Sequence, residues 1–148
     1  MITVIQRCTR GIVSVDHKTI GEIKHGLVIL LGVKNNDAES DADFLAHKIS
    51  NLRIFNDKND KMNLSIKDVG GSALVISQFT LCGDTRKGRR PSFINAASPD
   101  KGNRLYEWFA NQLKLNDVPV ELGEFAAMMD IELVNTGPVT FVLDSYDR

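Results

Sequence analysis

The residues that could do chemistry begin where an apolar run turns polar. The run "ALVIS" is typical of a buried strand and leads into "QFT", so that Ser77, Gln78 and Thr80 stand at its end. A glycine-containing loop follows, and it carries a cluster of four cations, Arg86, Lys87, Arg89 and Arg90. Such a cluster can hold phosphates, and arginine can stack on bases, so the loop indicates contact with a polyanion. Taken alone, the basic run is equally compatible with a solvated loop.

A second unusual stretch is "ELVNTGPVTFVLDS", residues 132–145. It reads as strand almost throughout, yet Gly137 and Pro138 interrupt the apolar run, where proline cannot donate to a sheet. An X-Pro bond costs only about 0.5 to 1 kcal/mol to place in cis, and a cis bond turns the chain sharply. The dipeptide is therefore either an ordinary turn between two strands or a rigid binding surface made of backbone.

No acid–base pair of side chains accompanies these motifs. His17 and His25 fall in turn-like positions and His47 lies off the apolar face of its helix, so each is expected to be solvated. The chain has no HExxH, GxSxG or Walker sequence, and its acidic residues are dispersed. We therefore expect no metal site, no Ser-His-Asp triad and no cofactor. Cys8 and Cys82 are expected to be buried, reduced thiols.

Composition limits the class of protein. The chain has 148 residues, of which 43% are hydrophobic and 25% charged, and its formal net charge is −1. These values predict one globular domain over residues 1–148 and no general attraction to nucleic acid or anionic lipid, so any polyanion contact must be local. No apolar run is long enough to span a membrane, and "MITVIQRCTRG" lacks the order of a signal peptide, which predicts a cytoplasmic location.

Two helices are expected from apolar residues at helical spacing. The first covers residues 35–52, with Ser40 and Asp43 in capping-box spacing. The second covers residues 98–115, with Ser98 as its cap and Pro99 at its first position, and Pro119 should end it. Their apolar faces are formed by Leu45, Ile49 and Leu52, and by Leu105, Trp108, Phe109 and Leu113.

Eight strands are expected from alternating or continuous apolar runs, at residues 2–15, 18–24, 27–33, 53–55, 72–77, 118–122, 131–135 and 139–145. Two helices are too few to supply the crossovers of a doubly wound parallel sheet. The predicted fold is therefore α+β: a curved, mostly antiparallel sheet or barrel with two packed α-helices.

Two motifs together resemble one family. In sequence and separation, "SQFTL" at residues 77–81 and "NTGPVT" at residues 135–140 resemble the D-aminoacyl-tRNA deacylase family, and neither departs from its pattern. The start "VIQRC", the loop "DTRKGRRPSF" and the length extend the resemblance over essentially the whole chain. The resemblance implies a homodimeric hydrolase that removes D-amino acids esterified to the 3′ end of tRNA, as chirality proofreading in translation.

The resemblance also implies a reason for the interrupted strand. In this family the Gly-Pro bond is cis, and one subunit supplies it to the active site of its dimer mate. This assigns chiral selection to Gly137 and Pro138, with Asn135 and Thr140 beside them. The two carbonyls would accept hydrogen bonds from the substrate ammonium and fill the space that an L side chain needs. A D side chain would point away, and glycine, which has no Cβ, should also be removed, as from a tRNA(Ala) mischarged with glycine.

For the chemical step, the resemblance points to the main chain of Ser77, Gln78, Phe79 and Thr80. The first two would shape the pocket, and the last two would face the ester, where N–H donors can stabilise a developing oxyanion. Thr80 could be a nucleophile, yet the sequence offers no neighbouring base to activate it. We therefore prefer assistance by a ribose hydroxyl of the tRNA, with Thr80 in a positioning role.

The remaining assignments concern tRNA binding and the support of the selector. The four cations of the loop would contact the acceptor stem or the terminal CCA. Arg7 in "VIQRC" is either a buried partner that orients the Gly-Pro element or a surface arginine. Two other classes of function stay open: a non-catalytic RNA-binding module, and a structural protein whose motifs only pack. Hydrolysis of D-tyrosyl-tRNA but not L-tyrosyl-tRNA would separate the deacylase from both.

Overall fold

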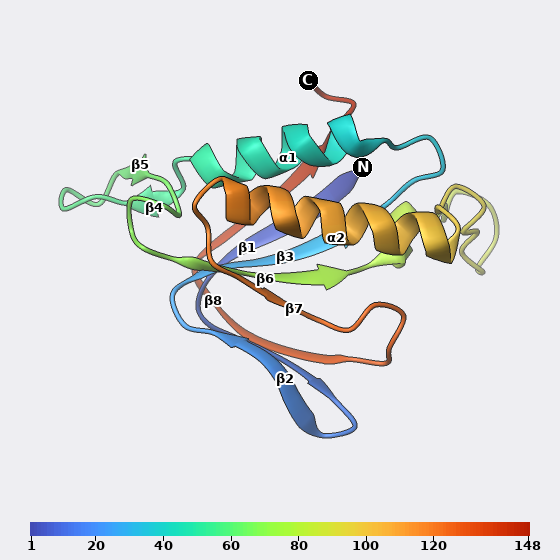
Figure 1. Cartoon of the computed structure of the whole chain (residues 1–148), viewed down its shortest axis with the longest axis horizontal. Coiled ribbons are helices and arrows are strands. Elements are labelled where there is room, and N and C mark those ends of the chain that lie inside the picture. The colour runs from blue at the N-terminus through green and yellow to red at the C-terminus, as the bar shows by residue number, and fades with distance from the viewer.

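The first strand pairs with three others and organises the sheet (Figure 1). The computed structural model describes residues 1–148. In chain order, the elements are β1 (Ile2–Val15), β2 (Lys18–Ile23), β3 (Gly26–Gly32), α1 (Glu39–Asn51), β4 (Phe55–Asn56), β5 (Met62–Leu64), β6 (Ser72–Ser77), the 3₁₀ helix η1 (Phe79–Cys82), α2 (Pro99–Leu115), β7 (Val120–Leu122) and β8 (Asp130–Asp144). Neither helix has the length and apolar character that crossing a bilayer requires.

The large sheet is mixed and strongly curved. Its order is β2-β1-β3-β6-β7, and β8 also pairs with β1. The pairs that include β1 are antiparallel, whereas β3–β6 and β6–β7 are parallel. Parallel neighbours need a crossover connection, and α1 and α2 lie in these two connections. The predicted class, a curved sheet with two packed helices, is confirmed.

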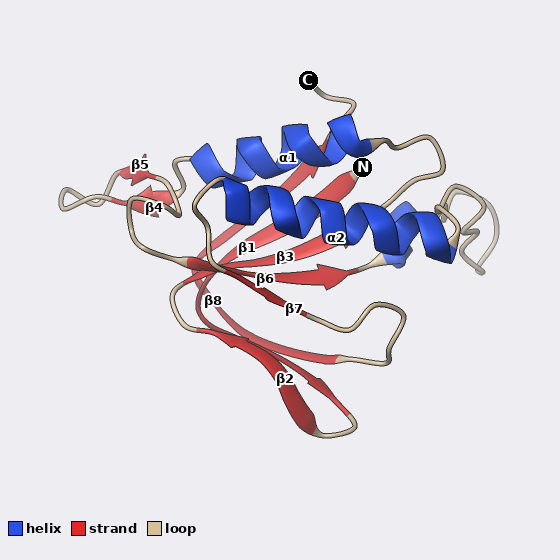
Figure 2. Ribbon diagram, in the orientation of Figure 1, coloured by secondary structure: helices blue, strands red, loops and turns tan.

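Both helices pack side by side over one face of the sheet (Figure 2). The predicted apolar faces are buried at Leu45 and Ile49 of α1 and at the predicted α2 positions except Trp108. Trp108 is only partly buried, and its indole N–H donates a hydrogen bond of 2.7 Å to Asp43 of α1. Tyr106, which the periodicity did not single out, is buried instead.

The first helix starts later than predicted, and the second ends at the predicted residue but before the expected stop at Pro119. The prediction of a capping box at Ser40 and Asp43 is wrong. Instead, α1 begins at Glu39, and the Asp41 carboxylate accepts a hydrogen bond of 2.8 Å from the N–H of Ala38. The second helix ends at Leu115, before Pro119, because Asp117 adopts a left-handed backbone with φ +62°.

The strands differ from the predictions near the end of the chain and in one hairpin. Residues 131–135 and 139–145 belong to one strand, β8, because both halves keep their pairing with β1. β4 starts at Phe55, where the strand predicted over residues 53–55 ends, and it pairs with the unpredicted β5. The polar residues around this short hairpin are also typical of a loop, so periodicity could not reveal it.

Candidate active site

A pocket of about 580 Å³ opens where β6 ends, and Ser77, Gln78 and Phe79 line it. The other walls come from the end of β3, Ala96 and Ala97, the first half of α2, the loop between β7 and β8, and Ile131 at the start of β8. Most of the lining is apolar, and it contains no histidine and no carboxylate. The pocket therefore offers shape and main-chain groups rather than a side-chain acid or base.

The turn after β6 sets the direction of the main chain at the pocket. The backbone N–H of Gln78 already donates a hydrogen bond to the Leu31 carbonyl, at 2.8 Å, and so does not face the pocket as a free donor. Phe79 and Thr80 then begin η1, and the first N–H groups of a helical turn have no partner within it. The Thr80 hydroxyl accepts a hydrogen bond from the Gln78 side-chain amide, which holds that hydroxyl in place.

The histidines and cysteines lie as the sequence predicts. His17, His25 and His47 are exposed, and none lines the pocket. Cys8 and Cys82 are buried and unpaired, and burial raises the pKa of the Cys8 thiol to about 11. Neither residue type offers an activated group to the site.

The Gly137–Pro138 peptide lies in a bulge of β8. Gln6 of β1 pairs with Thr140 and Cys8 pairs with Asn135, so residues 136–139 all face the single residue Arg7. The extra residues push the chain out of the ladder. Gly137 and Pro138 are exposed, their peptide bond is cis, and Gly137 has φ +125°, a conformation that L side chains rarely adopt.

Asn135 and Thr140 close the base of this bulge. The Asn135 side chain accepts the Val139 N–H at 3.1 Å and donates to the Thr140 hydroxyl at 2.9 Å. The amide of Gln6 also donates to that hydroxyl, at 3.3 Å. These contacts fix where the bulge leaves the strand and where it returns.

Arg7 supports the bulge from beneath. Its guanidinium is buried and donates to the carbonyl of Thr136 at 3.1 Å, to the carbonyl of Ile54 at 2.7 Å and to Asn56 Oδ1 at 3.0 Å. The alternative prediction, that Arg7 is a surface arginine, is therefore wrong. The side chain connects the base of the bulge to β4 and the segment before it.

The two motifs do not meet within one chain. Arg7 pairs with Leu27 and Leu27 with Ala73, whereas the pocket begins at Ser77, four residues further along β6. The pocket is displaced from the bulge by four residues of about 3.3 Å along the strands and by three strand spacings of about 4.8 Å across the sheet. Combined at right angles, these two displacements give a separation of roughly 20 Å. Accordingly, no residue of 135–140 lines the pocket.

The basic loop contains one paired cation and three free ones. Arg86 donates to the Asp84 carboxylate at 2.9 and 2.6 Å, and this guanidinium holds the pKa of Asp84 well below its usual range. Lys87, Arg89 and Arg90 are exposed and form no ion pair. These three cations have no carboxylate partner, whereas Asp84 already offsets the charge of Arg86.

The sequence predictions missed part of the pocket wall. Residues 125–129, "FAAMM", lie in the loop between β7 and β8 and line it, and Met128 is 91% exposed. Five consecutive apolar residues outside any strand or helix could have marked this loop. Tyr106 also lines the pocket, and its hydroxyl donates to the Val75 carbonyl at 2.9 Å, which anchors α2 to β6.

Comparisons with known proteins identify the family. The family model described as D-Tyr-tRNA(Tyr) deacylase matches residues 4–144. A Clostridioides difficile (strain 630) protein named D-aminoacyl-tRNA deacylase is 57% identical over 145 residues, with 98% of this chain and 97% of that protein covered. One of the same name from Koribacter versatilis (strain Ellin345) is 55% identical with the same coverage.

Solved structures share the fold. The c-Myc DNA Unwinding Element Binding Protein is 34% identical, with a TM-score of 0.91 over 97% of this chain and 98% of that chain. A probable eukaryotic D-amino acid tRNA deacylase has a TM-score of 0.84 with the same coverage, at 16% identity. Because the family model spans nearly all of the sequence, the chain belongs to the D-Tyr-tRNA(Tyr) deacylase family.

Proposed function

We propose that the protein hydrolyses the ester between a D-amino acid and the 3′ end of tRNA, and that it rejects the L ester by shape. Family membership supports the reaction class. Water adds to the ester carbonyl, the bond to the ribose oxygen breaks, and the products are the free D-amino acid and tRNA.

The observation that carries the selector is the exposed bulge at Gly137 and Pro138, which lies roughly 20 Å from the pocket of its own chain. A selector at that distance needs the pocket of a second copy. Val134 and Val142 of the same strand are 53% and 64% exposed, and they offer apolar surface that a second copy can cover. We therefore propose a homodimer in which each site combines the pocket of one protomer with the bulge of its partner.

Selection then follows from geometry at Cα. The carbonyl oxygens of Gly137 and Pro138 accept hydrogen bonds from the substrate ammonium, which fixes the orientation of the amino acid. Exchanging D for L exchanges the positions of Cβ and hydrogen, so an L side chain collides with main chain. Asn135, Thr140 and Arg7 hold that main chain in place. Glycine has no Cβ to collide, so glycyl-tRNA is also a substrate, including tRNA(Ala) mischarged with glycine.

The chemical step relies on main-chain donors and on the RNA. The N–H groups of Phe79 and Thr80 stabilise the oxyanion that forms at the ester carbonyl. The lining contains no histidine or carboxylate to act as general base, which supports assistance by the neighbouring ribose hydroxyl of the tRNA. Ser77 and Gln78 shape the pocket, and the Gln78 amide keeps the Thr80 hydroxyl in position. Lys87, Arg89 and Arg90, with Arg86, contact the tRNA phosphates.

The test is a deacylation assay with D-tyrosyl-tRNA, L-tyrosyl-tRNA and glycyl-tRNA, prepared with the same labelling. We expect rapid loss of the D and glycyl esters and an L ester that decays at the rate of a protein-free control. Binding of all three without hydrolysis would instead indicate an RNA-binding module. Neither binding nor hydrolysis would indicate a structural protein.

A further inference from the structure

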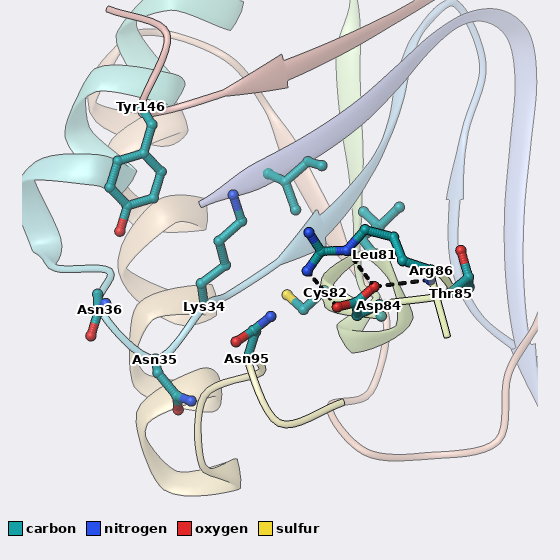
Figure 3. A pocket seen from close by; sticks show the side chains of 12 residues that line it. Lys34, Asn35, Asn36, Leu81, Cys82, Asp84, Thr85, Arg86, Asn95 and Tyr146 are labelled. Atoms are coloured by element: carbon teal, nitrogen blue, oxygen red, sulfur yellow. Dashed lines mark hydrogen bonds and ion pairs between the residues drawn. The ribbon is translucent and has the colours of Figure 1, made fainter. Parts of the chain in front are cut away.

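A second pocket, of about 710 Å³, lies beside the first and is lined mainly by polar residues (Figure 3). We call it the polar groove. Three short segments each contribute one residue to each pocket. Val33, Phe79 and Ala96 line the first pocket, and Lys34, Leu81 and Asn95 from the same segments line the second. The two pockets are thus separated by one thin wall built from η1 and its neighbours.

The groove carries amide groups that the protein does not use. Asn36 and Asn95 line it, and their side chains make no hydrogen bond within the chain. Asn35 donates to the Ile94 carbonyl at 2.7 Å, which leaves its side-chain oxygen free. An amide presents a donor and an acceptor together, and this combination can pair with the edge of an unstacked base.

An aromatic ring completes the lining, and the two cations beside it are already paired, Lys34 with Asp144 and Arg86 with Asp84. Tyr146 is 58% exposed, and Lys34 Nζ lies 5.0 Å from the centre of its ring. Figure 3 shows Tyr146, Lys34 and Asn36 on one side of the groove and Asp84 and Arg86 on the other. An exposed aromatic face and free amides are groups with which proteins stack on and pair with unstacked bases.

We infer that the polar groove binds the unpaired nucleotides that precede the terminal adenosine of tRNA. The inference rests on the proposed function, because that function places the ester at the first pocket. A strand leaving that pocket across η1 enters the groove next. A base stacks on Tyr146, and its edge pairs with Asn36 or Asn95.

The kinetic test compares two substrates, D-tyrosyl-tRNA and D-tyrosyl-adenosine, which lacks the preceding nucleotides. The ratio of their kcat/KM values should fall about tenfold in Tyr146→Ala and in Asn95→Ala, since one stacked or paired base is lost. Lys67→Ala, an exposed position outside the groove, should keep the wild-type ratio. A general structural defect would slow both substrates alike, and an unchanged ratio in both groove variants overturns the inference.

A binding test on the unsubstituted protein separates this inference from the proposed function. An RNA oligonucleotide ending in CCA should shift the side-chain amide NMR signals of Asn36 and Asn95, whereas adenosine monophosphate should not. Absence of these shifts under saturating RNA overturns the inference. If the protein fails to hydrolyse D-tyrosyl-tRNA yet the shifts occur, the proposed function fails and the groove remains a single-stranded RNA site.

Discussion

Arg7 Nε donates a hydrogen bond of 3.1 Å to the carbonyl oxygen of Thr136, the residue before Gly137. The same buried guanidinium donates to Ile54 and Asn56, so one side chain joins the bulge of β8 to β4 and the residue before it. A change at Arg7 should therefore affect both stability and the position of the proposed selector.

Arg7→Met should lower the free energy of unfolding by about 3 kcal/mol, because buried acceptors lose a charged donor. The preference for D over L esters should fall as well, since the bulge loses its support. Urea denaturation and paired D and L deacylation assays measure the two effects. Arg10→Met, at an exposed position on the same strand, is the matched control and should change neither. Equal behaviour of the two variants would show that Arg7 does not support the bulge.

Thr80→Ala should reduce kcat by less than about tenfold, because the hydroxyl contributes only a hydrogen bond to the Gln78 amide. Single-turnover deacylation of D-tyrosyl-tRNA measures the chemical step, and circular dichroism checks the fold. Near-complete loss of activity with the fold intact would identify Thr80 as a nucleophile.

The basic loop should make tRNA binding dependent on salt. Replacing Lys87, Arg89 and Arg90 together by alanine should weaken binding and reduce the slope of log K against log salt by about 2 to 3. Arg86→Ala should have a smaller effect, because Asp84 already neutralises this cation. Replacing Lys48, Lys58 and Lys61, three exposed lysines elsewhere, is the control for net charge. Equal slopes for the two triple variants would exclude the loop from the RNA interface.

Much of the fold could be predicted from periodicity. The long strand at residues 2–15 and the two helical faces depend on local alternation, which a single sequence displays. The start of the first helix was less predictable, because either Asp41 or Asp43 could cap it in sequence. In the folded chain Asp41 accepts the N–H of Ala38, and packing of the two helices places Asp43 against the indole N–H of Trp108.

The candidate site was predictable only in part. Two motifs marked the pocket and the bulge, but sequence alone does not place residues 77 and 137 roughly 20 Å apart. That separation depends on tertiary structure, because the start of β8 reaches the pocket at Ile131 whereas the bulge lies further along the same strand. The burial of Arg7 was likewise unpredictable, because it depends on Asn56 of β4, which is distant in the sequence and reaches Arg7 only in the folded chain.

Stability should depend on pH through the contact between Asp144 and Lys34, whose oxygen and nitrogen lie 2.5 Å apart. Partial burial raises the pKa of Asp144, but the hydrogen bonds from Lys34 and from the Tyr146 N–H, together with the charges of Lys34 and the N-terminal ammonium, leave the pKa below its usual range. Because the folded pKa lies below the unfolded value of about 3.9, the contact stabilises the protein above that pH, and the contribution is lost as pH falls through the folded pKa. Urea denaturation from about pH 6 to pH 2 should show a steeper loss for the native chain than for Asp144→Asn. Parallel curves would contradict this assignment.

Subunit mixing tests most directly whether the bulge of one protomer completes the pocket of another. Ala127→Trp should fill the pocket, and Gly137→Val should displace the bulge, because a Cβ at residue 137 would lie 2.9 Å from the Arg7 guanidinium. Each variant alone should be inactive on D-tyrosyl-tRNA, with gel filtration and circular dichroism as checks that both fold and dimerise.

After the two variants are mixed and allowed to exchange subunits, half of the dimers contain one of each, and each of these has one intact shared site. We predict that D-specific activity returns to about one quarter of the wild-type value. No activity above that of the separate variants, or a chain that remains monomeric, would contradict the shared site.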